Sequence, residues 1–181
     1  MPKFLTEKQV KQYREEGFIS PVCVMDETEA LSLREKIESF ESGQGKQMYG
    51  IQRTKCSLRF PFIYELATRK NILDAIEDLL GPNILMYQCA MWFKEPESGS
   101  YVSWHQDCCY YGMDPLALVS AWVALSPADA ESGCMQVIPG SHKGGQYPVE
   151  FTEIRETNLL ASGQNTLYEF DPTQAILMPL R

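Results

Sequence analysis

The stretch Trp104-His105-Gln106-Asp107 decides how this chain is interpreted, because it places an imidazole and a carboxylate two residues apart. Its surroundings predict an extended strand, and in a strand residues i and i+2 point to the same face. His105 and Asp107 are therefore expected to converge on one point. One imidazole and one carboxylate are two of the three ligands of the facial triad that binds non-heme Fe(II) and leaves positions open for oxygen chemistry. The third ligand should be a second histidine, and the chain's only other histidine is His142.

The composition predicts a single folded domain over residues 1–181. The chain is 44% hydrophobic and has a formal net charge of -8, and no apolar run is long enough to cross a bilayer. The negative charge argues against nucleic-acid and anionic-membrane partners, which select for clustered Lys and Arg. A small-molecule substrate is compatible with it, since one local basic pocket suffices. The composition does not indicate an oligomeric state.

The cysteines and the first residues of the chain indicate in which cellular compartment the protein is expected. Residues 1–7 contain no apolar signal region. The six cysteines include no C-x-x-C pair and most of them sit in apolar runs. This pattern predicts reduced thiols and a cytoplasmic location.

Three helices are predicted in the first half of the chain. Each follows a residue whose side chain can accept a hydrogen bond from the first helical turn. These residues are Thr6, Asp26 and Asn71, and Thr6 with Gln9 also has the pattern of a capping box. The helices are expected to end near Gly17, Phe40 and Leu80. A loop is expected at residues 42–45, and Gly81-Pro82 stops the third helix.

Short strands are predicted after Pro82. They are expected over residues 84–93, 101–109, 118–125, 134–138 and 175–180. Helices followed by several short strands are typical of an α+β fold in which the helices support a sheet sandwich or barrel.

Four motifs in a fixed order give the chain a family resemblance. They are Phe4-Leu5-Thr6 through Gly17-Phe18, then Trp104-His105-Gln106-Asp107, then Ser120-Ala121-Trp122-Val123-Ala124-Leu125, and last Glu131-Ser132-Gly133-Cys134-Met135 leading into Pro139-Gly140-Ser141-His142-Lys143. A lone H-x-D occurs by chance in many proteins, but the whole ordered set is specific. It resembles the phytanoyl-CoA dioxygenase family of Fe(II)/2-oxoglutarate-dependent oxygenases, over most of the chain up to about residue 148.

The resemblance implies a fold, a reaction and four site residues. The fold is a double-stranded β-helix, or jelly roll, with supporting N-terminal helices and the metal between its two sheets. His105 and Asp107 are implied as Fe(II) ligands, Gln88 as a contact of the 2-oxoglutarate co-substrate, and Trp122 as a residue that lines the pocket. The implied reaction is hydroxylation of a small organic substrate.

The end of the chain departs from the family pattern. Family members continue from a segment like residues 174–181 into a strand with the distal histidine and a further strand with an arginine that pairs with the co-substrate. Neither residue has a counterpart here, so the domain is expected to lack C-terminal strands. A site with two ligands should hold Fe(II) less tightly, and the resemblance leaves open whether this chain is an active enzyme.

Two other functions compete with the oxygenase interpretation. One is a non-catalytic or impaired relative that keeps the pocket as a binding module. The other is a hydrolytic Zn site made of His105, Asp107 and a cysteine. His142 follows a Pro-Gly-Ser turn, and we expect it to have a structural role or to lie at the rim of the substrate pocket.

Overall fold

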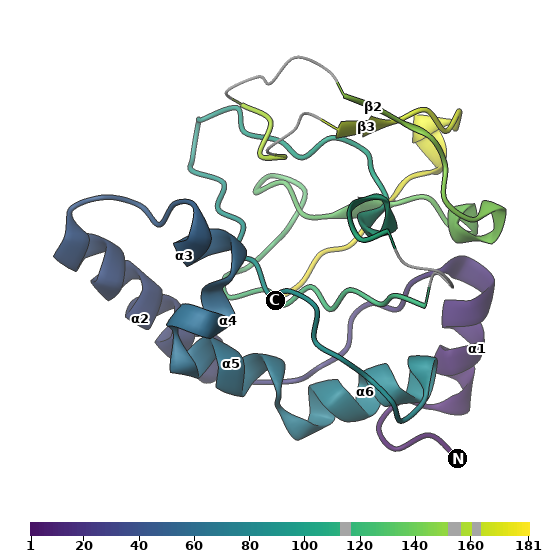
Figure 1. The fold of residues 1–181 in the computed structure, drawn as a ribbon, viewed down its shortest axis with the longest axis horizontal. Helices are drawn as coiled ribbons and strands as arrows, with labels where there is room; N and C mark the ends of the chain where they lie inside the picture. Colours follow the sequence, from purple (N-terminus) through teal and green to yellow (C-terminus); the bar gives the residue numbers. More distant parts are fainter. Residues whose placement is uncertain (113–116, 152–156, 161–163) are drawn as a thin grey trace.

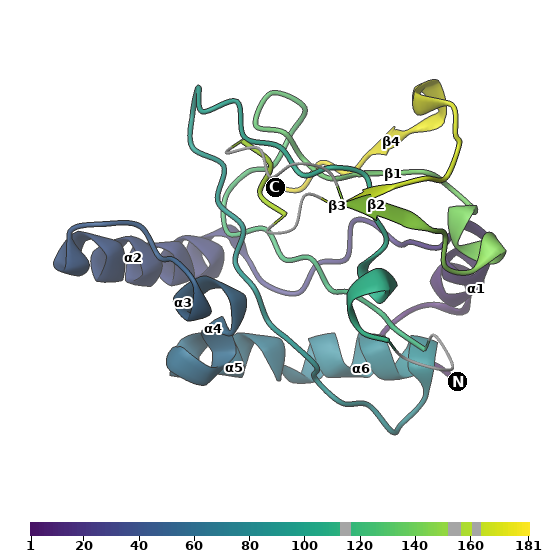
Figure 2. The same cartoon turned by 45° about the horizontal axis from the view of Figure 1, so that its top comes forward.

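The computed structural model describes residues 1–112, 117–151, 157–160 and 164–181, and the helices and strands in these ranges separate into two regions. Helices α2 to α6 line one side of the molecule, and the strands gather on the other (Figures 1 and 2). The helices are α1 (Glu7–Glu16), α2 (Glu27–Gln44), α3 (Ile51–Thr54), α4 (Cys56–Arg59), α5 (Pro61–Ala67) and α6 (Lys70–Leu80), with 3-10 helices η1 (Asp107–Tyr110), η2 (Ser141–Gly144) and η3 (Pro172–Gln174). The strands are β1 (Gln136–Val137), β2 (Val149–Phe151), β3 (Gln164–Thr166) and β4 (Ile176–Leu177). Within these ranges no helix has both the length and the hydrophobicity needed to span a membrane.

The capping predictions for the first two helices are confirmed. The Thr6 hydroxyl accepts a hydrogen bond from the Gln9 backbone N–H at 3.2 Å, and the Gln9 side chain accepts one from the Thr6 N–H at 2.9 Å. Asp26 accepts a hydrogen bond from the Glu29 N–H at 2.8 Å. The second helix continues to Gln44, so the loop predicted at residues 42–45 is mostly helical. It ends at Gly45 because that residue takes the left-handed conformation, with φ 70°.

The third predicted helix is present, but the prediction that Asn71 caps it is wrong. Arg69 occupies the N-cap position and makes no side-chain capping bond. Asn71 is the second residue of α6, and its Nδ2 donates to the Val24 carbonyl at 2.8 Å. The side chain therefore fastens α6 to the segment before α2. The short helices α3, α4 and α5 were not predicted, because four to seven residues are too few to show a helical period.

The core lies between the helices and the extended segments. One buried cluster contains Ile37, Met48, Cys56, Phe60, Ile63 and Met91. A second contains Leu33, Leu66 and Ile72, and the partly buried Val123 and Leu125 pack against it. Residues from the second half of the chain thus cover the apolar faces of the helices.

The strands form two antiparallel pairs. β1 pairs with β4, with Gln136 opposite Leu177, and β2 pairs with β3, with Phe151 opposite Gln164. The strands predicted at 134–138 and 175–180 are therefore confirmed in their central residues. The result is a mixture of helices and short strands.

Three of the predicted strands are wrong as regular strands: 84–93, 101–109 and 118–125. Segment 84–93 forms its backbone hydrogen bonds with the helical layer. The Met91 N–H donates to the Arg53 carbonyl at 3.0 Å, and the Cys89 carbonyl accepts from the Cys56 N–H at 3.2 Å. The second makes one isolated bridge, between Tyr101 and Asn158. In the described ranges, residues 118–125 join no strand pair. An apolar extended segment becomes a strand only where a neighbouring backbone supplies a ladder of partners.

The Pro-Gly-Ser-His turn closes the C-terminal end of α1. The Gly140 N–H donates to the Glu16 carbonyl at 2.8 Å. His142 Nε2 lies 3.1 Å from the Arg14 carbonyl oxygen, and since a carbonyl only accepts, Nε2 carries the hydrogen. Two helix-end carbonyls that lack intrahelical partners are satisfied in this way. The imidazole also lies over Gly17, whose φ is +89°.

The N-terminal segment is held by one carboxylate of α6. Asp78 accepts backbone hydrogen bonds from Lys3, Phe4 and Leu5 at 2.6, 2.9 and 2.8 Å. Desolvation raises the pKa of Asp78, but these three hydrogen bonds and the nearby Lys3 ammonium outweigh it, and the pKa is lowered from its usual value.

Replacing Asp78 with alanine should destabilise the fold by about 1–3 kcal/mol, because three backbone donors lose their acceptor. Because the folded-state pKa is depressed, the contribution of Asp78 is present above the unfolded-state pKa and is lost as the pH falls through the folded-state value. Urea unfolding at neutral and acid pH measures both effects. Asp74→Ala, which removes the ion pair with Lys70 and an electrostatic interaction with Lys3 but no backbone hydrogen bond to residues 3–5, is the control and should cost about 0.3–0.5 kcal/mol. Equal losses in the two variants would contradict the role of Asp78.

Gly17→Ala should destabilise the fold by at least about 1–2 kcal/mol, the cost of a left-handed backbone for a residue with a Cβ. A Cβ there would lie 2.5 Å from His142 Nδ1, so the imidazole would also have to move. The matched control is Gly43→Ala near the end of α2, where a Cβ meets nothing within 4 Å and φ is not positive. This control should be neutral or stabilising by up to about 1 kcal/mol. Urea midpoints compare the two variants, and an unchanged midpoint for Gly17→Ala would refute the proposed contact.

Candidate metal centre

His105 and Asp107 converge, although they do so without the predicted strand. His105 belongs to an extended segment, and Asp107 is the first residue of η1. His105 Nε2 lies 3.2 Å from Asp107 Oδ1. The turn of the chain into η1 thus achieves the convergence that strand geometry was expected to provide.

One backbone hydrogen bond sets the orientation and tautomer of the His105 ring. Nδ1 lies 2.8 Å from the Ser103 carbonyl oxygen. Because a carbonyl only accepts, Nδ1 carries the hydrogen, and in the neutral ring Nε2 presents its lone pair toward Asp107. Histidines that bind metals commonly donate their other ring N–H to a carbonyl in this way. The second carboxylate oxygen of Asp107 accepts a hydrogen bond from the Ser120 hydroxyl.

The electrostatics of the pair are those of two groups that stabilise each other's charged forms. Desolvation lowers the pKa of His105, but the hydrogen bonds to Asp107 and Ser103 outweigh it and raise the pKa above its usual value. The hydrogen bond from His105 lowers the pKa of Asp107, and the Ser120 hydroxyl lowers it further against desolvation. A positive charge between the two side chains, whether a proton or a metal ion, is therefore favoured.

The pair fits two neighbouring ligand positions of a metal ion. Two ligand atoms about 2.1 Å from one ion, at right angles to each other, are about 3.0 Å apart. The observed 3.2 Å separation is close to that value. Within the described ranges, no third His, Cys, Asp or Glu joins them to form a group that could hold a metal. The donor set thus fits two of the three positions of a facial triad.

The other two predicted site residues lie apart from this pair. Gln88 is exposed on the segment before the His-x-Asp motif. The neighbouring Tyr87 contacts Tyr111 with ring centroids 4.4 Å apart, which brings this segment to the end of η1. Trp122 is 40% exposed. The structure does not bring either side chain into the pocket described next.

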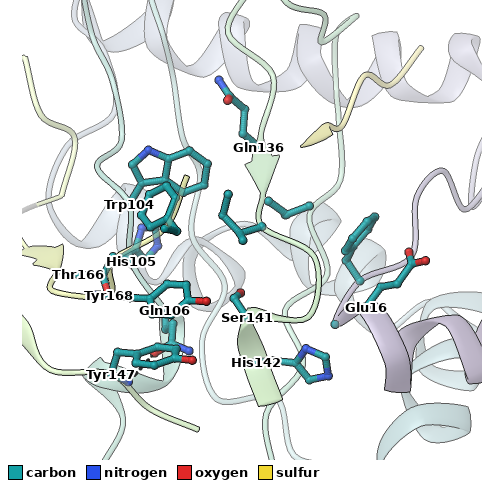
Figure 3. A pocket seen from close by; sticks show the side chains of 15 residues that line it. Glu16, Trp104, His105, Gln106, Gln136, Ser141, His142, Tyr147, Thr166 and Tyr168 are labelled. Atoms are coloured by element: carbon teal, nitrogen blue, oxygen red, sulfur yellow. Dashed lines mark hydrogen bonds between the residues drawn. The ribbon is translucent and has the colours of Figure 1, made fainter. Parts of the chain in front are cut away.

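A pocket lies beside His105 and is walled by aromatic side chains (Figure 3). Tyr147 stacks on Tyr168 with centroids 4.1 Å apart, and Phe170 lies 5.9 Å from Tyr168 and 4.9 Å from Trp104. Figure 3 shows this aromatic side opposite His142 and Glu16. The expected structural role of His142 is thus observed at α1, and the same residue also lines the pocket.

Gln106 fastens the loop that carries Tyr147, and this role was not predicted from the sequence. Its Nε2 donates to the Gly145 carbonyl at 3.0 Å, and its Oε1 accepts from the Tyr147 N–H at 2.8 Å. One signal for it was present in the sequence: in a strand, Gln106 would stand between two residues that share a face, so its own side chain would point away from them. Tyr147 and Tyr168 carried no motif and could be found only from the structure.

Comparison of the sequence with known proteins identifies a matching family and several relatives. The family model described as phytanoyl-CoA dioxygenase (PhyH) matches residues 13–179. A protein of Stutzerimonas stutzeri named "Probable alpha-ketoglutarate-dependent hypophosphite dioxygenase" is 31% identical over 140 residues, which are 77% of this chain and 49% of that protein. The peroxisomal phytanoyl-CoA dioxygenase of Bos taurus is 34% identical over 95 residues, which are 50% of this chain and 28% of that protein. The chain spans about half or less of the length of these relatives.

A solved structure extends the likeness to the fold. A non-heme monooxygenase, ThoJ in its apo form, superposes with a TM-score of 0.77 at 23% identity, over 95% of this chain and 64% of that one. Together with the family match, this likeness places the mixture of helices and short strands in the double-stranded β-helix fold family. With a family match over residues 13–179, the chain belongs to the phytanoyl-CoA dioxygenase family.

Proposed function

We propose that this chain is the metal-binding part of an Fe(II)/2-oxoglutarate-dependent dioxygenase that hydroxylates a small organic substrate. The observation that carries the proposal is the 3.2 Å separation of His105 Nε2 and Asp107 Oδ1, with the imidazole oriented by Ser103. Membership of the family and the likeness to a non-heme monooxygenase support the same chemistry.

His105 and Asp107 would bind the Fe(II), and hydrogen bonds with neighbouring residues would keep the two ligands in position. The Ser103 carbonyl keeps the imidazole hydrogen on Nδ1, so that Nε2 stays available as a ligand. The Ser120 hydroxyl occupies one oxygen of Asp107 and leaves the other facing His105. Fe(II) with 2-oxoglutarate, when bound, supplies the capacity to oxidise a C–H bond.

Gln88 and Trp122 are the proposed binding residues for the 2-oxoglutarate co-substrate. The support for Gln88 is its position beside Tyr87, whose ring contact with Tyr111 brings the segment to the end of η1. The support for Trp122 is its place in the Ser120-to-Leu125 motif, two residues from the hydroxyl that holds Asp107.

A second candidate, a binding module without turnover, is favoured by one observation. Among the described residues, no group of three or more His, Cys, Asp or Glu side chains could hold a metal ion, and a site with two ligands holds a metal less tightly than one with three. The experiment below distinguishes the two candidates.

Anaerobic titration of the chain with Fe(II), followed by calorimetry, tests the metal site. His105→Ala and Asp107→Ala should each abolish binding, because each removes a ligand. Ser120→Ala keeps both ligands and should weaken binding by about 10–100-fold, the usual effect of losing an outer hydrogen bond. Asp171→Ala, which removes an exposed aspartate that caps η3, is the control and should bind normally.

The outcomes separate three cases. Fe(II) binding together with succinate formation from 2-oxoglutarate supports the dioxygenase, and Fe(II) binding without succinate supports the binding module. Fe(II) binding that survives both ligand substitutions would refute the metal site itself.

A further inference from the structure

Two cysteines outside the metal site lie in contact. Cys56 is the first residue of α4, and Cys89 lies on the segment that follows α6. Their Sγ atoms are 3.6 Å apart, and Cys56 Sγ also lies 3.2 Å from the Cys89 carbonyl oxygen. The two backbones are joined as well, because the Cys56 N–H donates to the Cys89 carbonyl at 3.2 Å. This arrangement brings together residues that are 33 positions apart in the sequence.

We propose that Cys56 and Cys89 form a reversible disulfide, with a hydroperoxide as the oxidant. A disulfide requires the two sulfurs to approach to about 2.05 Å, and it requires backbones that are already close. The hydrogen bond between the two backbones meets the second condition, since it is the contact that sets neighbouring β-strands roughly 4.8 Å apart. Rotation about the Cα–Cβ bonds, with a small backbone shift, would bring the two sulfurs to bonding distance.

The two thiols differ in their exposure to solvent, and this difference determines which one reacts first with the oxidant. Cys56 has no exposed surface, whereas Cys89 is partly exposed. The hydrogen bond from Cys56 lowers the pKa of Cys89 against desolvation, and the same contact, with burial, raises the pKa of Cys56. Cys89 is therefore the thiol that meets the oxidant, and Cys56 is the one that completes the bond.

The chemistry balances in two steps. The Cys89 sulfur attacks the O–O bond of the hydroperoxide, forming a sulfenic acid and releasing an alcohol, or water if the oxidant is hydrogen peroxide. The Cys56 sulfur then attacks the Cys89 sulfur, the S–O bond breaks, and water leaves with the thiol proton. Overall, two thiols lose two electrons and two protons, and the peroxide is reduced.

The core around the pair explains why the bond would form between these residues and not with others. Cys56 belongs to the buried cluster with Phe60 and Met91, and Cys89 packs against the same cluster. No other cysteine among the described residues belongs to or packs against this cluster. The new bond would join α4 covalently to the segment that carries Gln88.

Mass spectrometry after trypsin digestion tests the proposal on the unmodified 181-residue chain. Cleavage after Lys55, Arg59, Lys70 and Lys94 leaves Cys56 alone on the peptide 56–59 and Cys89 alone on the peptide 71–94. Treatment with hydrogen peroxide, followed by alkylation in denaturant without reductant, should yield the two peptides as one linked species. Dithiothreitol before alkylation should return both as separate alkylated peptides.

Cysteine variants test which two residues form the disulfide. Cys89→Ser and Cys56→Ala should each abolish the linked species, whereas Cys23→Ser, which changes an exposed cysteine elsewhere, should leave it unchanged. Recovery of both peptides alkylated after peroxide, or of Cys89 as a sulfinic acid without linkage, would overturn the proposal. A different cysteine pairing as the main product would also overturn it. None of these outcomes depends on Fe(II), so they leave the proposed dioxygenase function untouched.

Discussion

The candidate metal centre depends on one hydrogen bond, from His105 Nδ1 to the Ser103 carbonyl. This bond fixes which ring nitrogen carries hydrogen, and so it decides that Nε2 faces Asp107 as an acceptor for a proton or a metal ion. The backbone that supplies the carbonyl is held in turn: the Ser103 hydroxyl donates to the Gln164 carbonyl, and the Thr166 N–H donates to the Trp104 carbonyl at 2.8 Å. The geometry of the pair therefore depends on contacts with a segment about 60 residues later in the chain.

The pocket beside His105 is built from the same kind of long-range contact. Gln106 holds the Tyr147 loop, and Tyr147 stacks on Tyr168, while the Pro-Gly-Ser-His turn closes α1 on the opposite side. His142 thus contacts both α1 and the pocket, because its Nε2–H donates to the Arg14 carbonyl and its ring lines the pocket. Gly17 and the turn are therefore in direct contact: the ring rests where a side chain on residue 17 would be.

The helical layer contributes more than support. Its short helices α3 and α4 accept and donate the backbone hydrogen bonds that segment 84–93 would otherwise exchange with a neighbouring strand. That arrangement places Cys89 against Cys56 and leaves Gln88 exposed. The segment that carries the proposed co-substrate contact is thus fixed from one side by the core and is open on the other.

The sequence alone determined the features that depend on nearby residues. The capping box at Thr6, the cap at Asp26 and the ends of the helices at Gly17 and Gly81 all follow from interactions within a few positions of the chain. The spacing of His105 and Asp107 also comes from the sequence, but the geometry of the pair depends on the contacts with residues 164 and 166. Only the tertiary structure decided the rest. Asn71 donates its side-chain hydrogen bond to the Val24 carbonyl and does not cap its own helix. In the described part of the chain, the predicted strands 84–93 and 118–125 are extended segments without strand partners, and 101–109 turns into η1 at Asp107. The physical reason is that a strand, a pocket wall or a thiol pair needs a partner from a distant part of the chain, and a local pattern does not specify which partner it will be.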